Sequence, residues 1–86
     1  MQYRIEFSRP ASRQFDSLPK QVQLRLKPRL DSLRDNPRPH GAEKMAGEEE
    51  LYRLRVGDYR VIYQIRDQAL VVLVVKIGHR KDVYRR

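Results

Sequence analysis

The chain has 86 residues, with 19 Lys or Arg against 11 Asp or Glu, and so a formal net charge of +8. This length predicts a single domain, residues 1–86, and the lack of cysteine excludes disulfide bonds and thiolate metal sites. The two histidines stand far apart and no apolar run is long enough to cross a bilayer, so we expect no metal site and no membrane span. The N-terminus does not read as a signal peptide, which favours a cytoplasmic protein. The excess of positive charge favours a polyanionic partner, such as nucleic acid, an acidic protein or an anionic membrane surface.

The N-terminal segment predicts a short strand followed by a short helix. Residues alternate over Tyr3–Phe7, as expected for a strand. Pro10 suits the first turn of a helix that Ser8 or Arg9 caps. Pro19 ends this helix or starts the next one.

A second helix is expected from Lys20 to about Arg34, because apolar residues recur there at spacings of four, four and three: Val22, Leu26, Leu30 and Leu33. Leu24 lies off this stripe, and Pro28 removes an amide from the helix, which predicts a kink or a break. Residues 36–41 are rich in proline and glycine and predict a loop. The polar segment Ala42–Glu50 ends in three glutamates and is interpreted as solvated.

The rest of the chain predicts three strands. They are Leu51–Val56, Tyr59–Arg66 and Ala69–Ile77, separated by the turns Gly57-Asp58 and Asp67-Gln68. The third segment is apolar throughout, which is typical of a central strand covered on both faces. The predicted order is βααβββ, an α+β fold in which two N-terminal helices pack on one face of a mostly antiparallel sheet.

A two-residue turn at Gly57-Asp58 fixes which side chains share a face. It places Arg55 directly opposite Arg60, and it places Arg53 on that same face, away from the apolar one. Like charges directly across a ladder are destabilising, so the pair makes sense if an anion normally lies between the two guanidinium groups. Three solvated arginines on an open sheet face are the alternative.

The C-terminal segment adds further basic and aromatic side chains. Gly78 is expected to turn the chain as it leaves the last strand. The segment is then either a disordered basic arm or a structure folded beside the arginines. In the second case His79 could exchange a proton near neutral pH, and Tyr84 could stack on a base or transfer a proton.

Three segments together resemble a known family: the loop NPRPHGAEKMAG, the hairpin LYRLRVGDYRVIYQI and the ending VVKIGHRKDVYR. On these motifs the chain resembles the RelE/ParE superfamily of bacterial type II toxin–antitoxin toxins, on the RelE side. The N-terminal RIEFSRPASRQFDSLPKQVQLRL matches more loosely, so the resemblance covers nearly the whole chain. The family fold, a sheet with two N-terminal helices, agrees with the predicted order.

The resemblance implies an endoribonuclease that needs no metal or cofactor and cuts mRNA in the ribosomal A site. The ribose 2′-hydroxyl attacks the adjacent phosphate, leaving a 2′,3′-cyclic phosphate and a 5′-hydroxyl. By position, the family's site residues correspond to Arg53, Arg55, Arg60, Arg80 and Tyr84. We therefore expect catalytic roles for Arg60, Arg80, Tyr84 and His79, and binding of RNA phosphate by Arg53, Arg55 and Lys81.

One departure from the family concerns the general base. The best-known ribosome-dependent members have lysines where this chain has Arg53 and Arg55. Lysine can lose its proton, whereas arginine in practice cannot, so these two residues are expected to clamp phosphate and stabilise its developing charge. The base is then Tyr84 or His79.

The resemblance also implies partners and leaves alternatives. A cognate RelB-like antitoxin is expected to wrap the domain with an extended acidic segment, in a hetero-oligomer that binds operator DNA through the antitoxin. The other expected partners are mRNA and rRNA on the ribosome. The alternatives to a nuclease are a ParE-like inhibitor of DNA gyrase and a non-catalytic module that binds an acidic partner.

Overall fold

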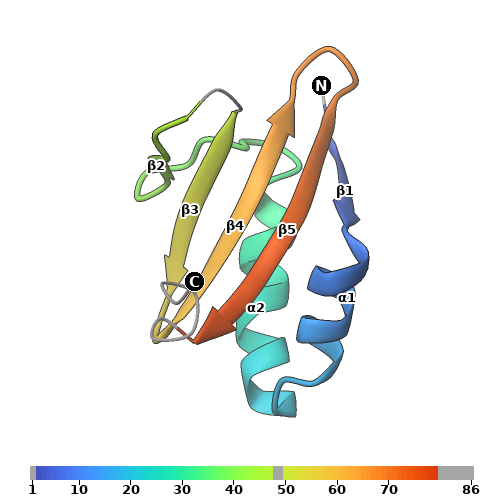
Figure 1. Ribbon diagram of the computed structural model, residues 1–86, viewed down its shortest axis with the longest axis vertical. Helices are drawn as coiled ribbons and strands as arrows, with labels where there is room; N and C mark the ends of the chain where they lie inside the picture. The colour runs from blue at the N-terminus through green and yellow to red at the C-terminus, as the bar shows by residue number, and fades with distance from the viewer. Residues whose placement is uncertain (1, 48–49, 80–86) are drawn as a thin grey trace.

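The computed structural model describes residues 2–47 and 50–79, which form a five-stranded sheet and two helices (Figure 1). In chain order the elements are β1 (Arg4–Phe7), α1 (Arg9–Asp16), α2 (Lys20–Ser32), β2 (Glu43–Lys44), β3 (Leu51–Val56), β4 (Tyr59–Arg66) and β5 (Val71–His79). The strand order in the sheet is β1-β5-β4-β3-β2, with β1 parallel to β5 and the other pairs antiparallel. The predicted α+β class is confirmed, and the last strand lies inside the sheet between β1 and β4. The expectation that both of its faces are covered is wrong, because among the described residues no helix packs on the face opposite α2. The predicted order is one strand short.

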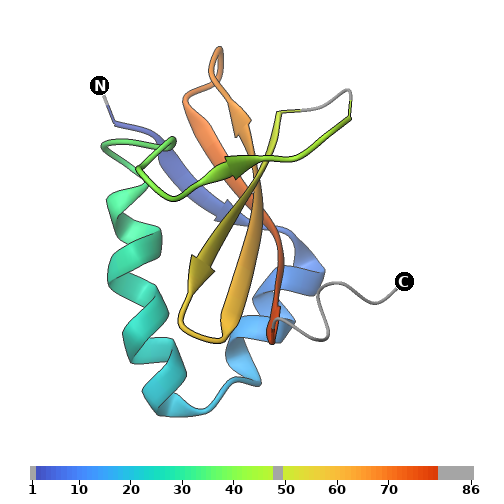
Figure 2. The ribbon, with the colours of Figure 1, turned by 90° about the vertical axis from the view of Figure 1, so that its left-hand side faces the viewer.

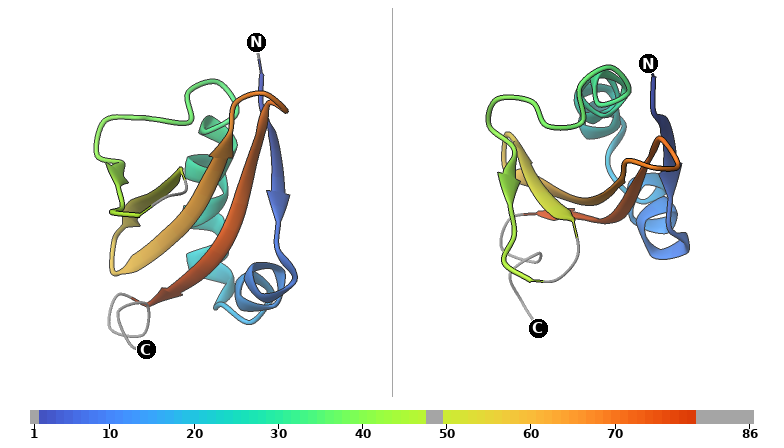
Figure 3. Two further views of the ribbon diagram at one scale, coloured as in Figure 1. Left: turned by 45° about the horizontal axis from the view of Figure 1, so that its top comes forward. Right: turned by 90° about the horizontal axis from the view of Figure 1, so that it is seen from above.

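The two helices lie differently against the sheet. α2 crosses one face, behind the strands in Figure 1, whereas α1 lies beside β5 beyond the end of β1 (Figure 2). At this edge Ser8 Oγ donates to the carbonyl of Val75 at 3.2 Å, and the Ile77 amide donates to Gln14 Oε1 at 2.7 Å. α1 therefore replaces β1 as the partner of β5, and the face opposite α2 is left without a helix (Figure 3).

The core lies between α2 and the sheet. The apolar stripe of α2 is buried as predicted, with Leu26, Leu30 and Leu33 at most 3% exposed. The predicted apolar face of the hairpin is buried too, by Tyr52, Leu54, Val56, Val61, Tyr63 and Ile65. Tyr59, at the end of that face, is only partly buried. Alternation along the strands thus places the arginines on the other side.

The helix boundaries follow mostly from local chemistry. Ser8 is the N-cap of α1, and its Oγ accepts from the Ala11 amide at 3.2 Å. α2 continues through Pro28 to Ser32, so the predicted break is wrong. Pro28 has no amide hydrogen to donate to the carbonyl of Leu24, and the helix continues without that bond. Neither helix of the described chain is long and apolar enough to cross a membrane.

Three boundaries in the strand region differ from expectation. Glu43–Lys44 forms β2, which was not predicted because two polar residues carry no alternating pattern. The turn before β5 spans 67–70 rather than two residues, because Leu70 takes a positive φ of 55°. β5 consequently starts later and extends further, so Gly78 lies inside the strand instead of turning the chain.

A polar cluster joins three loops at the end of the sheet far from the Gly57-Asp58 turn. Arg38 donates to Asp67 at 2.9 Å and to the Tyr52 hydroxyl at 3.0 Å, and it lies 3.4 Å from Glu50. Hydrogen bonds from Arg38 and Tyr3 lower the pKa of Asp67, and Lys44 and Tyr52 lower the pKa of Glu50. Glu50 is thus solvated, as interpreted, with its side chain 43% exposed, but it also pairs with Lys44 and Arg38.

Tyr63 makes stability depend on alkaline pH. Its hydroxyl is buried and donates to the carbonyl of Pro37 at 2.8 Å, and burial raises its pKa to about 12. The folded state therefore keeps a proton that the unfolded state loses near pH 10, so this stabilisation is full below pH 10 and lost as the pH rises through about 12. Tyr63→Phe should cost about 1–3 kcal/mol at pH 8. Urea denaturation at several pH values should show this cost shrinking above pH 10; a constant cost would contradict the prediction.

Candidate functional site

The β3–β4 hairpin has the predicted register. Gly57 takes φ 61° in the turn, a conformation that favours glycine. Arg55 pairs with Arg60, and Arg53 pairs with Ile62. The prediction that the three arginines share the face opposite the core is confirmed, because their neighbours along each strand are the buried residues.

β5 extends this arrangement by one strand. Lys76 lies opposite Ile62 and Gly78 lies opposite Arg60, while Ile77 between them is buried at 2% exposure. Two cross-strand rows result. One is Arg53–Ile62–Lys76 and the other is Arg55–Arg60–Gly78. We call the surface formed by these side chains the arginine face: Arg53, Arg55, Arg60, Ile62 and Lys76.

The three arginines have different surroundings. Arg53 Nη2 lies 2.7 Å from Glu43 Oε1, and its side chain is 31% exposed. Arg55 is exposed, and its Nε donates to the carbonyl of Gly57 at 3.1 Å. Arg60 is partly buried between its two neighbouring strands. β2 thus supplies a carboxylate that orients Arg53, whereas Arg55 and Arg60 lie directly opposite each other, an arrangement that an anion between them would stabilise.

The Arg55–Arg60 pair should reduce the stability of the free protein. Like charges directly opposite in a ladder repel, so Arg55→Gln should raise the free energy of unfolding by about 0.2–1 kcal/mol. The matched control is Arg66→Gln, on the same face of the hairpin but opposite the apolar Val71. Urea denaturation at low salt measures both variants. A destabilised Arg55→Gln protein would show that the pair does not carry this cost.

His79 lies on the other side of the sheet from the arginines. It pairs with Tyr59, and the two rings meet edge to face with centroids 5.6 Å apart and an interplanar angle of 77°. The structure therefore brings Arg53, Arg55 and Arg60 together but does not bring His79 to them. The predicted site residues Arg80, Lys81 and Tyr84 lie outside the described residues.

Glu43 was not predicted as part of the arginine face, and Lys76 was considered only as one of the basic residues of the C-terminal segment. Lys76 joins the arginine face because β5 carries a bulge between the partners of Ile62 and Tyr63. Glu43 joins it through the short strand β2. The isolated lysine in an apolar run was a visible signal for Lys76, but without the bulge its face could not be assigned.

The chemistry of the arginine face is that of an anion site. A guanidinium group donates to two phosphate oxygens at once and keeps its charge at any accessible pH. Over residues 2–47 and 50–79, no group of three or more His, Cys, Asp or Glu side chains could hold a metal ion. What the described side chains can do is bind a phosphodiester and stabilise negative charge that develops on it.

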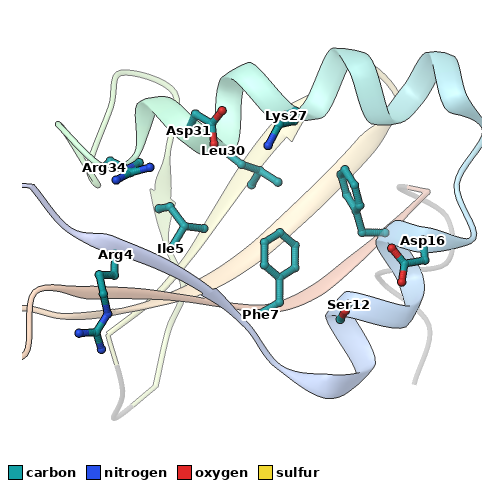
Figure 4. A pocket seen from close by; sticks show the side chains of 10 residues that line it. Arg4, Ile5, Phe7, Ser12, Asp16, Lys27, Leu30, Asp31 and Arg34 are labelled. Carbon is teal, nitrogen blue, oxygen red and sulfur yellow. The ribbon is translucent and has the colours of Figure 1, made fainter.

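Apart from the arginine face, a pocket lies between β1, α1 and α2, on the helix side of the molecule (Figure 4). Its volume is about 440 Å³, and Phe7 and Phe15 meet edge to face within it with centroids 5.9 Å apart. Its charged lining is mixed, with Lys27 and Asp31 both on α2. Its lining combines apolar side chains with three basic and two acidic ones, a mixture that does not select a polyanion as the arginine face does, so the arginine face remains the candidate site.

Comparison with known proteins agrees on one group of relatives. The family described as the ParE toxin of the type II toxin–antitoxin system parDE matches residues 5–84. The mRNA interferase toxin RelE of Escherichia coli (strain K12) is 33% identical over 88 residues, covering 98% of this chain and 92% of the relative. The archaeal RelE–RelB complex from Pyrococcus horikoshii OT3 contains a chain that is 32% identical with a TM-score of 0.78, covering 93% of this chain and 97% of that one. The isolated E. coli RelE toxin in its P21 form has a TM-score of 0.81 at 28% identity, covering 90% of this chain and 83% of that one.

Proposed function

Because this chain belongs to the RelE/ParE superfamily of type II toxin–antitoxin toxins, we propose that it is an mRNA endoribonuclease that acts on the ribosome and inhibits translation. The observation that best supports this function is the Arg55–Arg60 pair, in which two like charges lie directly opposite each other on a face without a helix. Such a pair is unfavourable in the free protein and favourable around a phosphate. The RelE relatives are named mRNA interferases, which supports RNA as the source of that phosphate.

The proposed reaction is attack of the ribose 2′-hydroxyl on the adjacent phosphorus, with loss of the 5′-oxygen of the next nucleotide. Arg55 and Arg60 bind the non-bridging oxygens and stabilise the charge that grows on them. Arg53 binds a neighbouring phosphate. Arg80 assists the leaving oxygen, and Lys81 contributes to RNA binding. A group other than arginine must take the 2′-hydroxyl proton, and the position of His79 on the far face favours Tyr84.

The proposed partner in the resting state is a RelB-like antitoxin. Solved relatives include RelE–RelB complexes from P. horikoshii and E. coli. A chain of net charge +8 attracts an acidic segment, which would cover the arginines and block RNA. The complex would bind operator DNA through the antitoxin. The proposed compartment is the cytoplasm, where translation takes place.

Inducible expression followed by primer extension on a translated message tests this function. We expect cuts within codons that disappear when translation of that message is blocked. Growth arrest with intact message and altered plasmid supercoiling would instead support the gyrase-inhibiting alternative. The absence of growth arrest would support a non-catalytic binding module.

A further inference from the structure

A pocket of about 460 Å³ lies at the edge of β5, where α1 ends. Its lining includes Gln14 and Leu18 from the α1 side and Tyr59, Lys76 and His79 from the strands. The phosphate site described above uses none of these residues except Lys76. The pocket therefore needs an explanation of its own.

Gln14 gives the pocket a hydrogen-bond donor of fixed orientation. The backbone N–H of Ile77 can only donate, so the Gln14 atom 2.7 Å away must be the carbonyl oxygen Oε1. The amide of Gln14 is thereby held in one orientation. Its Nε2 remains to meet a ligand, since no residue in the described part of the chain accepts a hydrogen bond from it. A base edge in this pocket would face a donor.

Tyr59 and His79 form an aromatic wall of the same pocket. Both side chains are partly buried, and their edge-to-face contact leaves the ring planes 77° apart. Bases of single-stranded RNA stack on tyrosine and histidine rings whatever their sequence. The wall thus supplies stacking for any base, while Gln14 supplies discrimination.

The pocket and the proposed phosphate site meet at Gly78. Tyr59 and His79 line the pocket from the face opposite the arginines, so RNA bound at Arg60 would reach it around the edge of β5. Gly78 lines the pocket and is also the direct cross-strand partner of Arg60. Neighbouring strands are about 4.8 Å apart, so one strand spacing separates the backbone at Arg60 from the pocket wall. Glycine at this position adds no side chain between them. Lys76 belongs both to the arginine face and to the pocket lining, and it can bind the phosphate that connects a nucleotide in the pocket to the scissile phosphate.

We propose that this pocket binds the base of a nucleotide next to the scissile phosphate and selects a keto base. This inference rests on the proposed nuclease function. The Gln14 Nε2 donor matches the O6 acceptor of guanine or the O4 acceptor of uracil, whereas adenine and cytosine present an amino donor at the equivalent position. One well-placed hydrogen bond of this kind discriminates between bases by about 10-fold.

Gln14→Glu tests the proposal because it changes one atom type and keeps the fold. A glutamate oxygen can still accept from the Ile77 amide, but the second oxygen is an acceptor in place of Nε2. The wild type should bind uncleavable trinucleotides with a 2′-deoxyribose at the scissile position about 10-fold more tightly with G or U beside it than with A or C. In Gln14→Glu this ratio should be lost or inverted, whatever the overall affinity. Gln68→Glu, an exposed control in the β4–β5 turn, should keep it.

Two further readouts separate this inference from the proposed function. Binding should shift the imidazole proton resonances of His79 more than those of the exposed loop residue His40, and Tyr59→Leu should weaken binding of all four bases. An unchanged G/U preference in Gln14→Glu, no preference in the wild type, or no shift at His79 would overturn the proposed pocket. If mRNA is nevertheless cleaved in cells, such a result would contradict the pocket but not the proposed nuclease function. If the protein prefers G and U in binding but cleaves no mRNA in cells, the proposed nuclease function is wrong and the pocket is a base-binding site only.

Discussion

Arg60→Ala is expected to abolish growth arrest and to reduce mRNA cleavage by about 10²–10³-fold, the usual loss when one group that stabilises developing charge is removed. Arg60 is the partly buried arginine at the centre of its row, with Arg55 on one side and Gly78 on the other. A phosphate bound at this place would contact it directly. The fold should persist, because the side chain lies opposite the core and its removal relieves the repulsion from Arg55.

Arg66→Ala is the matched control for this experiment. It removes the same charge from the same face of β4, six residues further along and therefore about 20 Å away. Single-turnover cleavage of a ribosome-bound message measures activity, and the urea midpoint measures stability. Full toxicity of a stably folded Arg60→Ala protein would refute the proposed phosphate site. Equal losses in both variants would show that overall charge, rather than this position, is what matters.

The hairpin could be predicted from the sequence because two independent signals agree there. Gly57-Asp58 fixes the turn, and alternation from Tyr52 to Arg66, interrupted only at Ile62, fixes the faces, so a shift by one residue would bury the arginines. The pairing of Arg55 with Arg60 follows from those two facts alone. The apolar stripe of α2 was predictable for the same reason, since spacings of three and four leave one consistent face.

The rest of the site depends on contacts between distant segments. The faces of the sheet on which Lys76 and His79 lie depend on the bulge in β5, where Val75 is the extra residue, and on the left-handed conformation of Leu70. Neither feature has a local sequence signal. β2 exists because Glu43 and Lys44 find hydrogen-bond partners on the edge of β3, whereas their own sequence favours no strand. Gln14 reaches β5 only because β1 ends at Phe7. Tertiary structure decides each of these positions, and a single sequence without an alignment does not show it.

Leu54→Ala should have the largest effect on stability, about 2–5 kcal/mol, which is typical of a large side chain removed from a packed core. Leu54 is 1% exposed and lies between Arg53 and Arg55 on β3. Its burial against the helix side is what directs both arginines to the opposite face. The expected loss is a substantial part of the 5–15 kcal/mol that stabilises an ordinary domain.

Leu24→Ala is the control, since it makes the same change at a leucine that is 63% exposed on α2. Its effect should stay within about 0.5 kcal/mol, as for other exposed positions. Urea denaturation measures both variants, and cleavage assays run well below the unfolding midpoint separate stability from activity. Leu54→Ala should then cleave at nearly the wild-type rate in the cold and lose activity on warming, whereas Arg60→Ala should be inactive at every temperature. A loss of cleavage by folded Leu54→Ala at low temperature would mean that the core sets the geometry of the arginine face more tightly than the register alone requires.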